Sequence, residues 1–397
     1  MVAADDLYFA LNDMDAQLAN VLLGSDATGS AALYERRRQQ VDADVRRLAA
    51  ANAGDANLTL LLDGLGRYEA LAANAMLLHG QHDATQALNT YRAATTLLRS
   101  TLLARAQAVV DEQSQKLNTG YRTEMRRVTV ARIAVVGVAV LLLILLAELQ
   151  RFLARRFRRT VNPGVLSASA LTVVLAGGAL LMLGQHGHDL RRAKQDAFDS
   201  IVALSHARAF SYDANADESR YLLDPQRADI YRQAFIDKTQ QVLDLPGATL
   251  ATYDQQLAAA WQAYHANPAR AGWGGAMGVE FGNITFAGER PAAELTVERF
   301  QQYQAVDRQI RQLADTGRRT AAIVLCTSYA PGGSNYAFER YDTALSDLIA
   351  VNSRAFDSAV RTDRRLLVWS RWLPLPLAAA ILLLLAAGIR PRLAEYR

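Results

Sequence analysis

Three apolar runs constrain this chain more than any other feature. They cover residues 128–148, 164–184 and 372–389, and only Arg132 and Glu148, both in the first run, are charged. A helix needs about 20 apolar residues to cross the hydrocarbon core of a bilayer. Each run meets or nearly meets this length, so the sequence predicts three transmembrane helices. A buried core helix is the alternative for each run, and Pro374 and Pro376 lie in the third.

The loop between the first two runs predicts the orientation. Residues 149–163, LQRFLARRFRRTVNP, contain five arginines. Short arginine-rich loops tend to stay in the cytoplasm, whereas long domains cross the membrane largely regardless of charge. We therefore expect the loop and the tail, residues 390–397, to be cytoplasmic. The long regions, residues 1–127 and 185–371, are then extracytoplasmic domains of a multi-pass plasma-membrane protein.

The loop itself has two possible roles. Arginines alternate with Phe152, Leu153 and Phe157, which predicts a short amphipathic helix. It could anchor to anionic lipid headgroups, at about 1 kcal/mol for each basic residue near the surface. Alternatively, it is a docking surface for a cytoplasmic partner. The candidate residues for either role are Arg155, Arg156, Arg158 and Arg159.

A weak internal repeat relates the two long regions. Shifted by 200 positions, Asp13, Ala16, Leu22 and Leu23 fall on identical residues. The first copy has fewer residues ahead of it, and the opening residues MVAADDLYFAL form no export signal. We therefore expect a further transmembrane helix before residue 1.

Both long regions are predicted to be helical. Leu7, Leu11, Met14 and Leu18 follow the three-to-four spacing of a helix that buries one face. Breaks at residues 24–29, 52–55 and 79–83 divide the first region into four helices, and the fourth can continue into the first apolar run. Short turns between antiparallel helices are typical of a four-helix bundle. The expected fold is an all-α membrane protein with two such extracytoplasmic bundles.

Two insertions interrupt the second bundle. Residues 267–293 are rich in glycine and aromatic residues, and residues 330–338 read APGGSNYAF. The segments VEF and ITF on either side of Gly282-Asn283 could pair as a β-hairpin. Aromatic residues on loops of a rigid scaffold suit recognition, although they could equally fold back onto the bundle.

No residue pattern indicates catalysis. The sequence contains no phosphate-binding glycine motif, nucleophile elbow or kinase signature. The histidine pairs His79/His82 and His186/His188 supply too few ligands for a zinc site. The acidic pairs Asp13/Asp15 and Asp217/Glu218 are interpreted as surface salt bridges. We predict no enzyme, no cofactor, no metal and, with a net charge of only +4, no nucleic-acid partner.

Several stretches resemble a known family. LYFALNDMDAQLANVLLG, DANADESRYLLDP, GVEFGNITFAGER, AVDRQIRQLADTGRRTAAIVLC and APGGSNYAFERYDTAL look like the GlnX-type membrane proteins of actinobacteria. The resemblance implies extracytoplasmic amino-acid sensing, chiefly of glutamate and aspartate. It implies an extracytoplasmic solute-binding lipoprotein, GlnH-like, as partner. It also implies that cytoplasmic protein kinase G responds, directly or indirectly, and adjusts carbon and nitrogen metabolism.

The resemblance places partner contacts on the two insertions. The candidates are Trp273, Glu280, Phe281, Asn283, Ser334, Asn335, Tyr336 and Phe338. Two other functions remain open: a receptor that binds an amino acid directly between its helices, and a structural membrane scaffold without a ligand. A homo-oligomer is compatible with each of the three.

Overall fold

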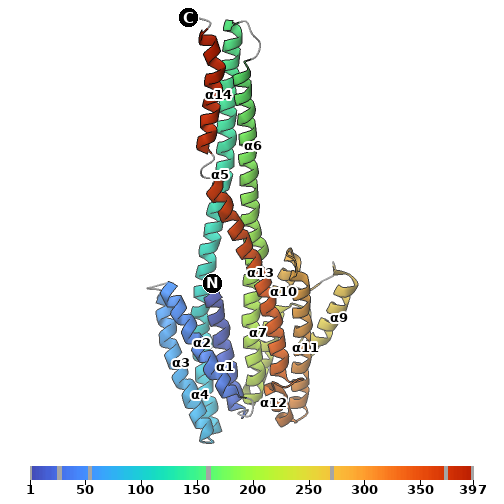
Figure 1. The fold of residues 1–397 in the computed structure, drawn as a ribbon. Coiled ribbons are helices and arrows are strands. Elements are labelled where there is room, and N and C mark those ends of the chain that lie inside the picture. Colours follow the sequence, from blue (N-terminus) through green and yellow to red (C-terminus); the bar gives the residue numbers. More distant parts are fainter. Residues whose placement is uncertain are drawn as a thin grey trace. The chain divides into compact units, whose positions relative to one another are not determined.

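The computed structural model describes residues 2–24, 29–51, 56–157, 162–268, 272–370 and 374–394 of the chain. The fold is all-α, as predicted (Figure 1). The break expected at residues 79–83 separates two helices, and residues 25–28 and 52–55 of the other two expected breaks lie outside the described residues. Among the described residues, β-type pairing is limited to one isolated bridge between Asp244 and Gly274. The helices of the first half are α1 (Val2–Leu22), α2 (Ser30–Ala51), α3 (Ala56–Gly80), α4 (Ala84–Leu97), the π-helical segment η2 (Leu98–Leu102) and α5 (Leu103–Phe157).

The second half continues with further helices, from short to long. It contains α6 (Pro163–Arg191), the π-helical segment η3 (Arg192–Phe198), α7 (Asp199–Leu223), the 3₁₀ turn η4 (Pro225–Arg227), α8 (Ala228–Val242), α9 (Tyr253–Ala266), α10 (Gly275–Asn283), α11 (Glu289–Asp315), α12 (Arg319–Thr327), α13 (Ser334–Ser370) and α14 (Pro374–Ala394).

The chain forms two compact units. The first unit combines residues 1–116 with residues 198–353, and the second combines residues 117–197 with residues 354–397. We describe each unit by itself. The first unit therefore draws helices from both of the regions that were expected to form separate bundles.

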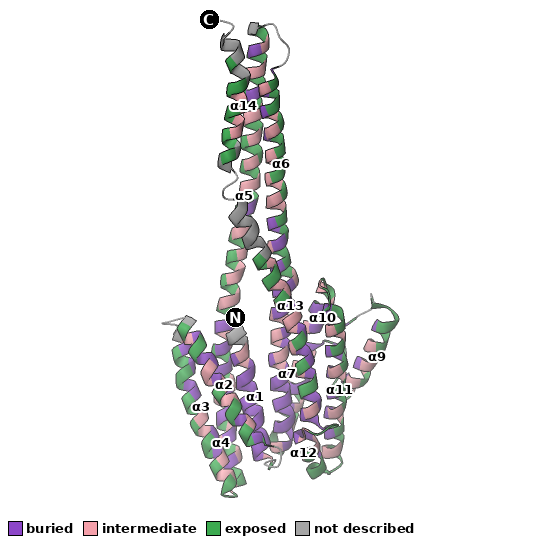
Figure 2. Ribbon diagram, in the orientation of Figure 1, coloured by how far each residue is buried: buried purple, intermediate pink, exposed green. Residues whose placement is uncertain are grey.

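A single core explains why these two regions pack together. One continuous cluster of buried apolar residues contains Leu11 and Leu61 of the first region and Leu257, Phe300 and Leu345 of the second. Within this unit α1 packs against both α2 and α7, and α7 packs against α8. Figure 2 shows α1 and α7 as largely buried. A helix that is buried on all sides must place its polar residues inside the protein, which sets up the site described below.

The second unit contains the first two apolar runs and most of the third. Leu146, Leu153, Val165 and Ala168 of α5 and α6 form a small cluster, against which Ile381, Leu384 and Leu385 of α14 pack. Many other apolar side chains face outward: Val174 is 68%, Leu181 is 77% and Leu383 is 70% exposed. Apolar surface on this scale is costly in water and suits a hydrocarbon solvent.

Among the described residues, two continuous helices are long and apolar enough to cross a membrane, by length and composition. They run from Ala84 to Arg155 and from Pro163 to Leu223. The first agrees with the prediction that the fourth helix continues into the first apolar run. In α14, the apolar stretch found among the described residues is shorter, Ala378–Ala387. Residues 372 and 373 of the third predicted span lie outside the described residues.

The predicted β-hairpin in residues 267–293 is wrong. Residues 275–283 form the helix α10, which buries Met277 and Glu280 against the unit. Gly275 has φ of 69°, a left-handed conformation that glycine adopts without strain, and it redirects the chain into the helix. The burial of these two side chains outweighs the local turn signal at Gly282-Asn283.

Candidate functional site

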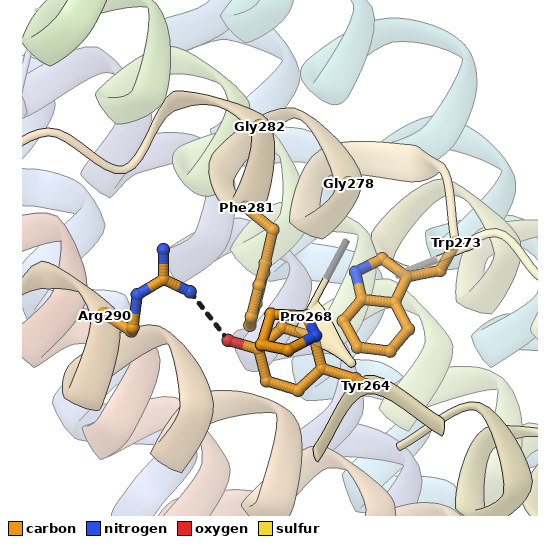
Figure 3. A pocket seen from close by; sticks show the side chains of 7 residues that line it. All are labelled: Tyr264, Pro268, Trp273, Gly278, Phe281, Gly282 and Arg290. Atoms are coloured by element: carbon orange, nitrogen blue, oxygen red, sulfur yellow. Dashed lines mark hydrogen bonds between the residues drawn. The ribbon is translucent and has the colours of Figure 1, made fainter. Parts of the chain in front are cut away.

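An aromatic pocket opens between α9, α10 and the start of α11 (Figure 3). Its volume is about 400 Å³, within the range of about 300–1,000 Å³ that is usual for small-molecule sites. We call it the aromatic pocket. It is lined by Tyr264, Pro268, Trp273, Gly278, Phe281, Gly282 and Arg290.

The rings around this pocket hold each other in place. The Phe281 ring stands nearly perpendicular to Tyr264, at a centroid distance of 5.2 Å, and to Trp273, at 5.3 Å. Trp261 stacks against Tyr264, at 5.3 Å and 11° between the ring planes. Edge-to-face and offset-stacked pairs are the favoured aromatic geometries. The walls are therefore preformed rather than assembled by a ligand.

Two polar groups are available at the aromatic pocket. The Arg290 Nη1 donates a hydrogen bond of 2.9 Å to the Tyr264 hydroxyl, which itself donates to Glu294 at 2.7 Å. The indole Nε1 of Trp273 is buried and has no hydrogen-bond partner among the described residues. An unsatisfied buried donor costs about 1–3 kcal/mol, so this group gains from any acceptor that reaches it.

Two glycines of α10 line the pocket, and only one of them is in a close contact. A Cβ at Gly278 would lie 2.7 Å from the Trp273 carbonyl oxygen, closer than atoms can approach. A Cβ at Gly282 would meet nothing within 4 Å, although this residue also lines the pocket. Gly278 is therefore required by packing, whereas Gly282 borders open space.

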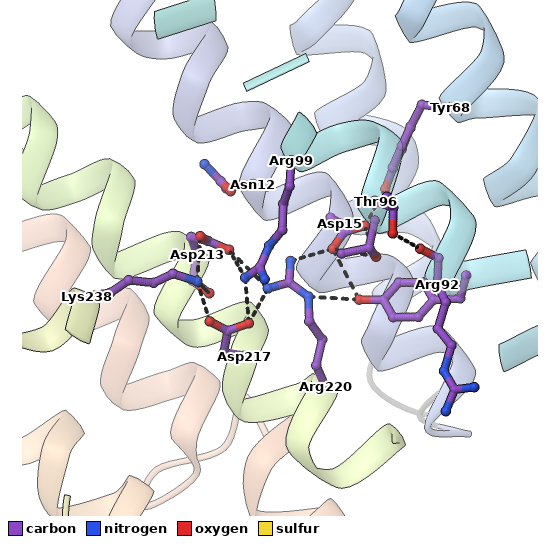
Figure 4. A network of polar contacts seen from close by, with 12 residues as sticks. Asn12, Asp15, Tyr68, Arg92, Thr96, Arg99, Asp213, Asp217, Arg220 and Lys238 are labelled. Atoms are coloured by element: carbon purple, nitrogen blue, oxygen red, sulfur yellow. Dashed lines mark hydrogen bonds and ion pairs between the residues drawn. The ribbon is translucent and has the colours of Figure 1, made fainter. Parts of the chain in front are cut away.

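A second feature of the first unit is a buried ionic network around Arg220 (Figure 4). The fully buried guanidinium donates to Asp213 at 3.0 Å and to Asp217 at 2.5 Å, both on α7 like itself. It also donates to Asp15 of α1 at 2.6 Å. The two helices of the internal repeat are thus joined by an ion pair in their shared interface.

Asp15 extends the network into the rest of the first half. Its carboxylate accepts hydrogen bonds from Tyr68 of α3 at 3.0 Å and from Tyr91 and Thr95 of α4 at 3.2 and 3.1 Å. A buried carboxylate needs this many donors, because desolvating an unpaired charge costs several kcal/mol. One aspartate therefore links α1, α3, α4 and α7.

The network is balanced in charge. Arg99 and Lys238 join Arg220, so three cations face Asp15, Asp213 and Asp217. Burial by itself would raise the pKa of Asp213, but Lys238, Arg99 and Arg220 together hold it below its usual range. Asp213 is therefore ionised at neutral pH, and removing any one cation leaves a buried carboxylate without compensation.

A π-helical segment places Arg99 in this network. Arg99 belongs to η2, where the helix from Ala84 to Arg155 departs from α-helical hydrogen bonding. Its Nη2 donates to Asp213 at 3.1 Å and to Asp217 at 2.8 Å. Short π-helical segments within α-helices are frequent at functional sites.

The repeat found in the sequence has a counterpart in the contacts. Asp13 of α1 is bound by Arg37 of α2, and Asp213 of α7 is bound by Lys238 of α8 at 2.5 Å. The spacing along the chain is 24 residues for the first of these pairs and 25 for the second, as their numbers show. Each copy thus joins its first two helices by an ion pair at the same position.

Two further carboxyl pairs lie in the first unit. The buried Glu218 forms a hydrogen bond to Asp307, accepts one from Ser334 at 2.7 Å, and lies beside the Asp307–Arg311 ion pair. Burial, followed by the neighbouring Asp307, raises the pKa of Glu218 well above its usual value. Two carboxyl groups in such contact share a proton at neutral pH.

The second pair consists of Glu280 and Glu289. Burial, with Glu289 adding to it, raises the pKa of Glu280 to about 7. Asn352 of α13 donates to Glu280 at 3.3 Å, and Ser200 of α7 also forms a hydrogen bond with it. Glu289 accepts from the backbone amides of Thr285 and Phe286 at 2.7 and 2.9 Å. This pair therefore ties α10 and α11 to α7 and α13.

The structure places the predicted partner-binding residues in three settings. Trp273 and Phe281 line the aromatic pocket, and Glu280 belongs to the carboxyl pair just described. Asn283, half-buried, donates to Ser200 at 3.0 Å. The remaining four lie at the start of α13.

Three of those four are buried. Ser334 binds Glu218, Asn335 donates to the Thr327 carbonyl at 3.1 Å, and Phe338 packs edge-to-face on Tyr212 at 4.8 Å. Tyr336 is partly exposed and lines a shallow cavity of about 190 Å³. As placed, Ser334, Asn335 and Phe338 fix the preceding loop rather than face solvent.

The predicted cytoplasmic arginines are only partly described. Arg155 is exposed near the end of α5, and Arg156 lies in the same helix. Arg158 and Arg159 lie outside the described residues. Their role in docking or lipid contact stays a prediction.

Sequence reasoning missed the ionic network. The acidic pairs Asp13/Asp15 and Asp217/Glu218 were interpreted as surface salt bridges, and this is wrong, because all four are buried. Acidic residues on a surface and in a paired interior look the same in one sequence. The repeat offered one signal, since it aligns Asp13 with Asp213 within otherwise apolar matches.

The described residues contain no group of three or more histidine, cysteine, aspartate or glutamate side chains placed to hold a metal ion. Comparison with family models gave one match: residues 1–122 match the model described as "Actinobacterial sensor domain". Searches of curated proteins and of solved structures found no match. The matched segment covers α1 to α4, η2 and the beginning of α5, including Asp15 and Arg99. The match supports an actinobacterial sensor protein.

Proposed function

We propose that this chain is a multi-pass membrane sensor that relays a signal from outside the cell to a cytoplasmic pathway. The observation that carries the proposal is the uninterrupted helix from Ala84 to Arg155. Its first part contributes Tyr91, Thr95 and Arg99 to the buried ionic network, and its later part is the first apolar run. A helix that continues from a buried network into a predicted membrane span can transmit small helix shifts.

The sensor-domain match supports the sensing part of this proposal. The exposed apolar faces of α5 and α6 support a membrane location. The arginine-rich loop supports the proposed orientation, in which residues 149–163 are cytoplasmic and both long regions are extracytoplasmic.

The finer proposal follows the resemblance to GlnX-type proteins. An extracytoplasmic, GlnH-like solute-binding lipoprotein binds glutamate or aspartate and contacts this chain. Protein kinase G, directly or through another protein, then responds to a change in the cytoplasmic loop and adjusts carbon and nitrogen metabolism. Of the proposed contact residues, Phe281, Asn283 and Tyr336 are partly exposed, and the others are buried.

A relay requires that the loaded lipoprotein and the empty lipoprotein act differently on this chain. A ligand with equal affinity for two states of a protein shifts neither of them. We therefore expect the glutamate-loaded lipoprotein and the empty lipoprotein to bind the chain with affinities that differ by about tenfold or more, equivalent to about 1.4 kcal/mol.

The test uses the full chain in lipid nanodiscs, titrated by calorimetry with the loaded lipoprotein, the empty lipoprotein and glutamate alone. Tyr336→Ala should weaken lipoprotein binding, whereas Ile230→Ala, an exposed apolar residue on α8, is the matched control. Equal affinity of the two lipoprotein states would contradict the relay. Heat from glutamate alone would instead favour a direct receptor.

A further inference from the structure

We propose that the aromatic pocket binds a small carboxylic acid that carries a flat apolar tail, the chemistry of an aryl carboxylate or an aromatic amino acid. This proposal concerns α9, α10 and α11; Trp273 and Phe281 are also proposed lipoprotein contacts, but the tests below use no lipoprotein. It rests on three observations: the shape of the pocket, the charge at its edge, and an unpartnered donor in its wall.

The shape of the pocket selects a flat tail. Tyr264 and Trp273 lie 5.3 Å apart with 45° between their planes, and Phe281 is perpendicular to both (Figure 3). A planar group can stack on one of these rings while its edge meets another, which are the geometries that aromatic rings prefer. An elongated polar ligand would leave this apolar wall uncovered.

The charge at the pocket selects an anion. Arg290 is the one charged side chain among the seven lining residues, and its guanidinium is exposed next to the Tyr264 ring. Aromatic boxes also bind ammonium groups, and Glu294, which accepts from the Tyr264 hydroxyl, is the group that would attract one. Arg290, however, is the charged residue that lines the pocket itself. Guanidinium binds carboxylates through two parallel hydrogen bonds.

The unpartnered donor supports the same ligand class. Trp273 is only 6% exposed, its Nε1 lacks a partner among the described residues, and the nitrogen faces the side where Phe281 and Gly278 lie (Figure 3). The nitrogen has almost no accessible surface in the empty pocket, so a small movement of the Trp273 ring would let a carboxylate oxygen satisfy this donor. A hydrocarbon ligand would fill the pocket and leave the indole unsatisfied.

A ligand bound in the aromatic pocket would also affect contacts outside it. Phe281, in the pocket wall, is adjacent in sequence to Glu280, which is hydrogen-bonded to Ser200 of α7 and Asn352 of α13. A ligand that shifts α10 therefore acts on contacts made by two other helices of the unit. Through these contacts, ligand binding in the pocket would affect other helices of the first unit.

The experiment titrates the full chain in nanodiscs with phenylacetate, L-phenylalanine and phenethylamine, followed by calorimetry and by tryptophan fluorescence. Phenylacetate tests the carboxylate with an apolar tail, and phenethylamine tests the opposite charge on a similar tail. We expect saturable binding of phenylacetate or phenylalanine at or below about 1 mM, and weaker binding of phenethylamine.

Three variants test the site. Arg290→Gln should weaken carboxylate binding by about tenfold, and Arg290→Lys should recover part of the loss. Gly282→Leu should abolish binding by filling the mouth of the pocket, where a side chain meets no protein atom near its Cβ. Arg318→Gln removes an exposed arginine elsewhere and should leave binding unchanged.

Each contrary result overturns the proposal. Absence of saturable carboxylate binding, tighter binding of phenethylamine, or undiminished binding in Gly282→Leu would each do so. The melting temperature of every variant shows whether it is folded. None of these results depends on the lipoprotein, so the ligand-binding proposal is tested separately from the relay.

Discussion

At the scale of single residues, Arg220 shows how this protein uses buried charge. Its guanidinium is fully buried and meets Asp15, Asp213 and Asp217. Such a network need not be more stable than a well-packed apolar core, but removing one partner leaves charges uncompensated. Its value lies in specificity, because α1 and α7 can pair only where these groups meet.

The first prediction concerns Arg220→Met. We expect the free energy of unfolding to fall by about 3–5 kcal/mol, because the three carboxylates lose their shared cation. Arg318→Met, at an exposed position, should change it by less than about 0.5 kcal/mol. The measurement is denaturant unfolding of the full chain in nanodiscs. Adding Asp15→Asn to Arg220→Met should cost less than the sum of the single changes, since the two residues contact each other.

The second prediction concerns the pH dependence at Glu280. Its pKa in the folded protein is about 7, above the ordinary value of 4.5, so the folded state binds the proton more tightly than the unfolded chain. Stability that depends on this proton is fully present below about pH 4.5, declines as the pH rises, and is lost above about pH 7. The melting temperature should therefore fall by several degrees between pH 5.5 and pH 8, about 2–4 °C for each kcal/mol.

Glu280→Gln is the variant that tests this cause. The neutral amide imitates the protonated carboxyl next to Glu289, so the fall in melting temperature should become smaller and the variant should be the more stable protein at pH 8. Glu298→Gln, an exposed position on α11, serves as the control. A fall of equal size in Glu280→Gln and the original chain would assign the effect to other groups.

At the scale of elements, α10 shows where local and tertiary signals compete. The turn-like Gly282-Asn283 favoured a hairpin, but burial of Met277 and Glu280 produces a helix instead. Gly278 is the residue that lets this helix sit against Trp273. The shape of the aromatic pocket depends on that close approach.

The third prediction compares two glycines of α10. Gly278→Ala should destabilise the protein by about 1–3 kcal/mol, because its Cβ would lie 2.7 Å from a backbone carbonyl that cannot move aside freely. Gly282→Ala adds a methyl group in open space and should be neutral or stabilise the helix by up to about 1 kcal/mol. Denaturant unfolding of the two variants measures the difference. Equal effects would show that α10 does not pack on Trp273 in this way.

The same element shows what could be predicted from the sequence. The helical class and the break at residues 79–83 follow from spacing and turn residues, which are local signals. Trp273 and Phe281 stand out in the sequence as aromatic residues of a glycine-rich insertion, and their role in recognition stays a prediction. Tyr264 and Arg290 do not stand out, because they belong to α9 and α11 and meet Trp273 only in the folded chain. The partners of Asp15 were missed for the same reason, since Arg220 lies 205 residues away.

At the scale of the whole molecule, three helices have residues in both compact units. These are α5, α13 and the helix that continues from α6 through η3 into α7. The ionic network, through Arg99 and Asp213, lies on or contacts these helices within the first unit. The Glu280–Glu289 pair does so through Asn352 of α13. The account therefore requires that the first unit be extracytoplasmic and that the loop at the end of α5 be cytoplasmic.

The most direct test of that claim is the sidedness of two positions. Thr320→Cys places a thiol at an exposed position in the first turn of α12, and Arg155→Cys places one near the end of α5. The native Cys326 is buried. Both variants also carry Cys326→Ser, so that each has a single thiol, and the chain with Cys326→Ser alone gives the background. Intact cells are treated with a membrane-impermeant maleimide before or after lysis. The account predicts that Thr320→Cys is labelled in intact cells and Arg155→Cys only after lysis. The reverse pattern, or labelling of both positions in intact cells, would contradict it.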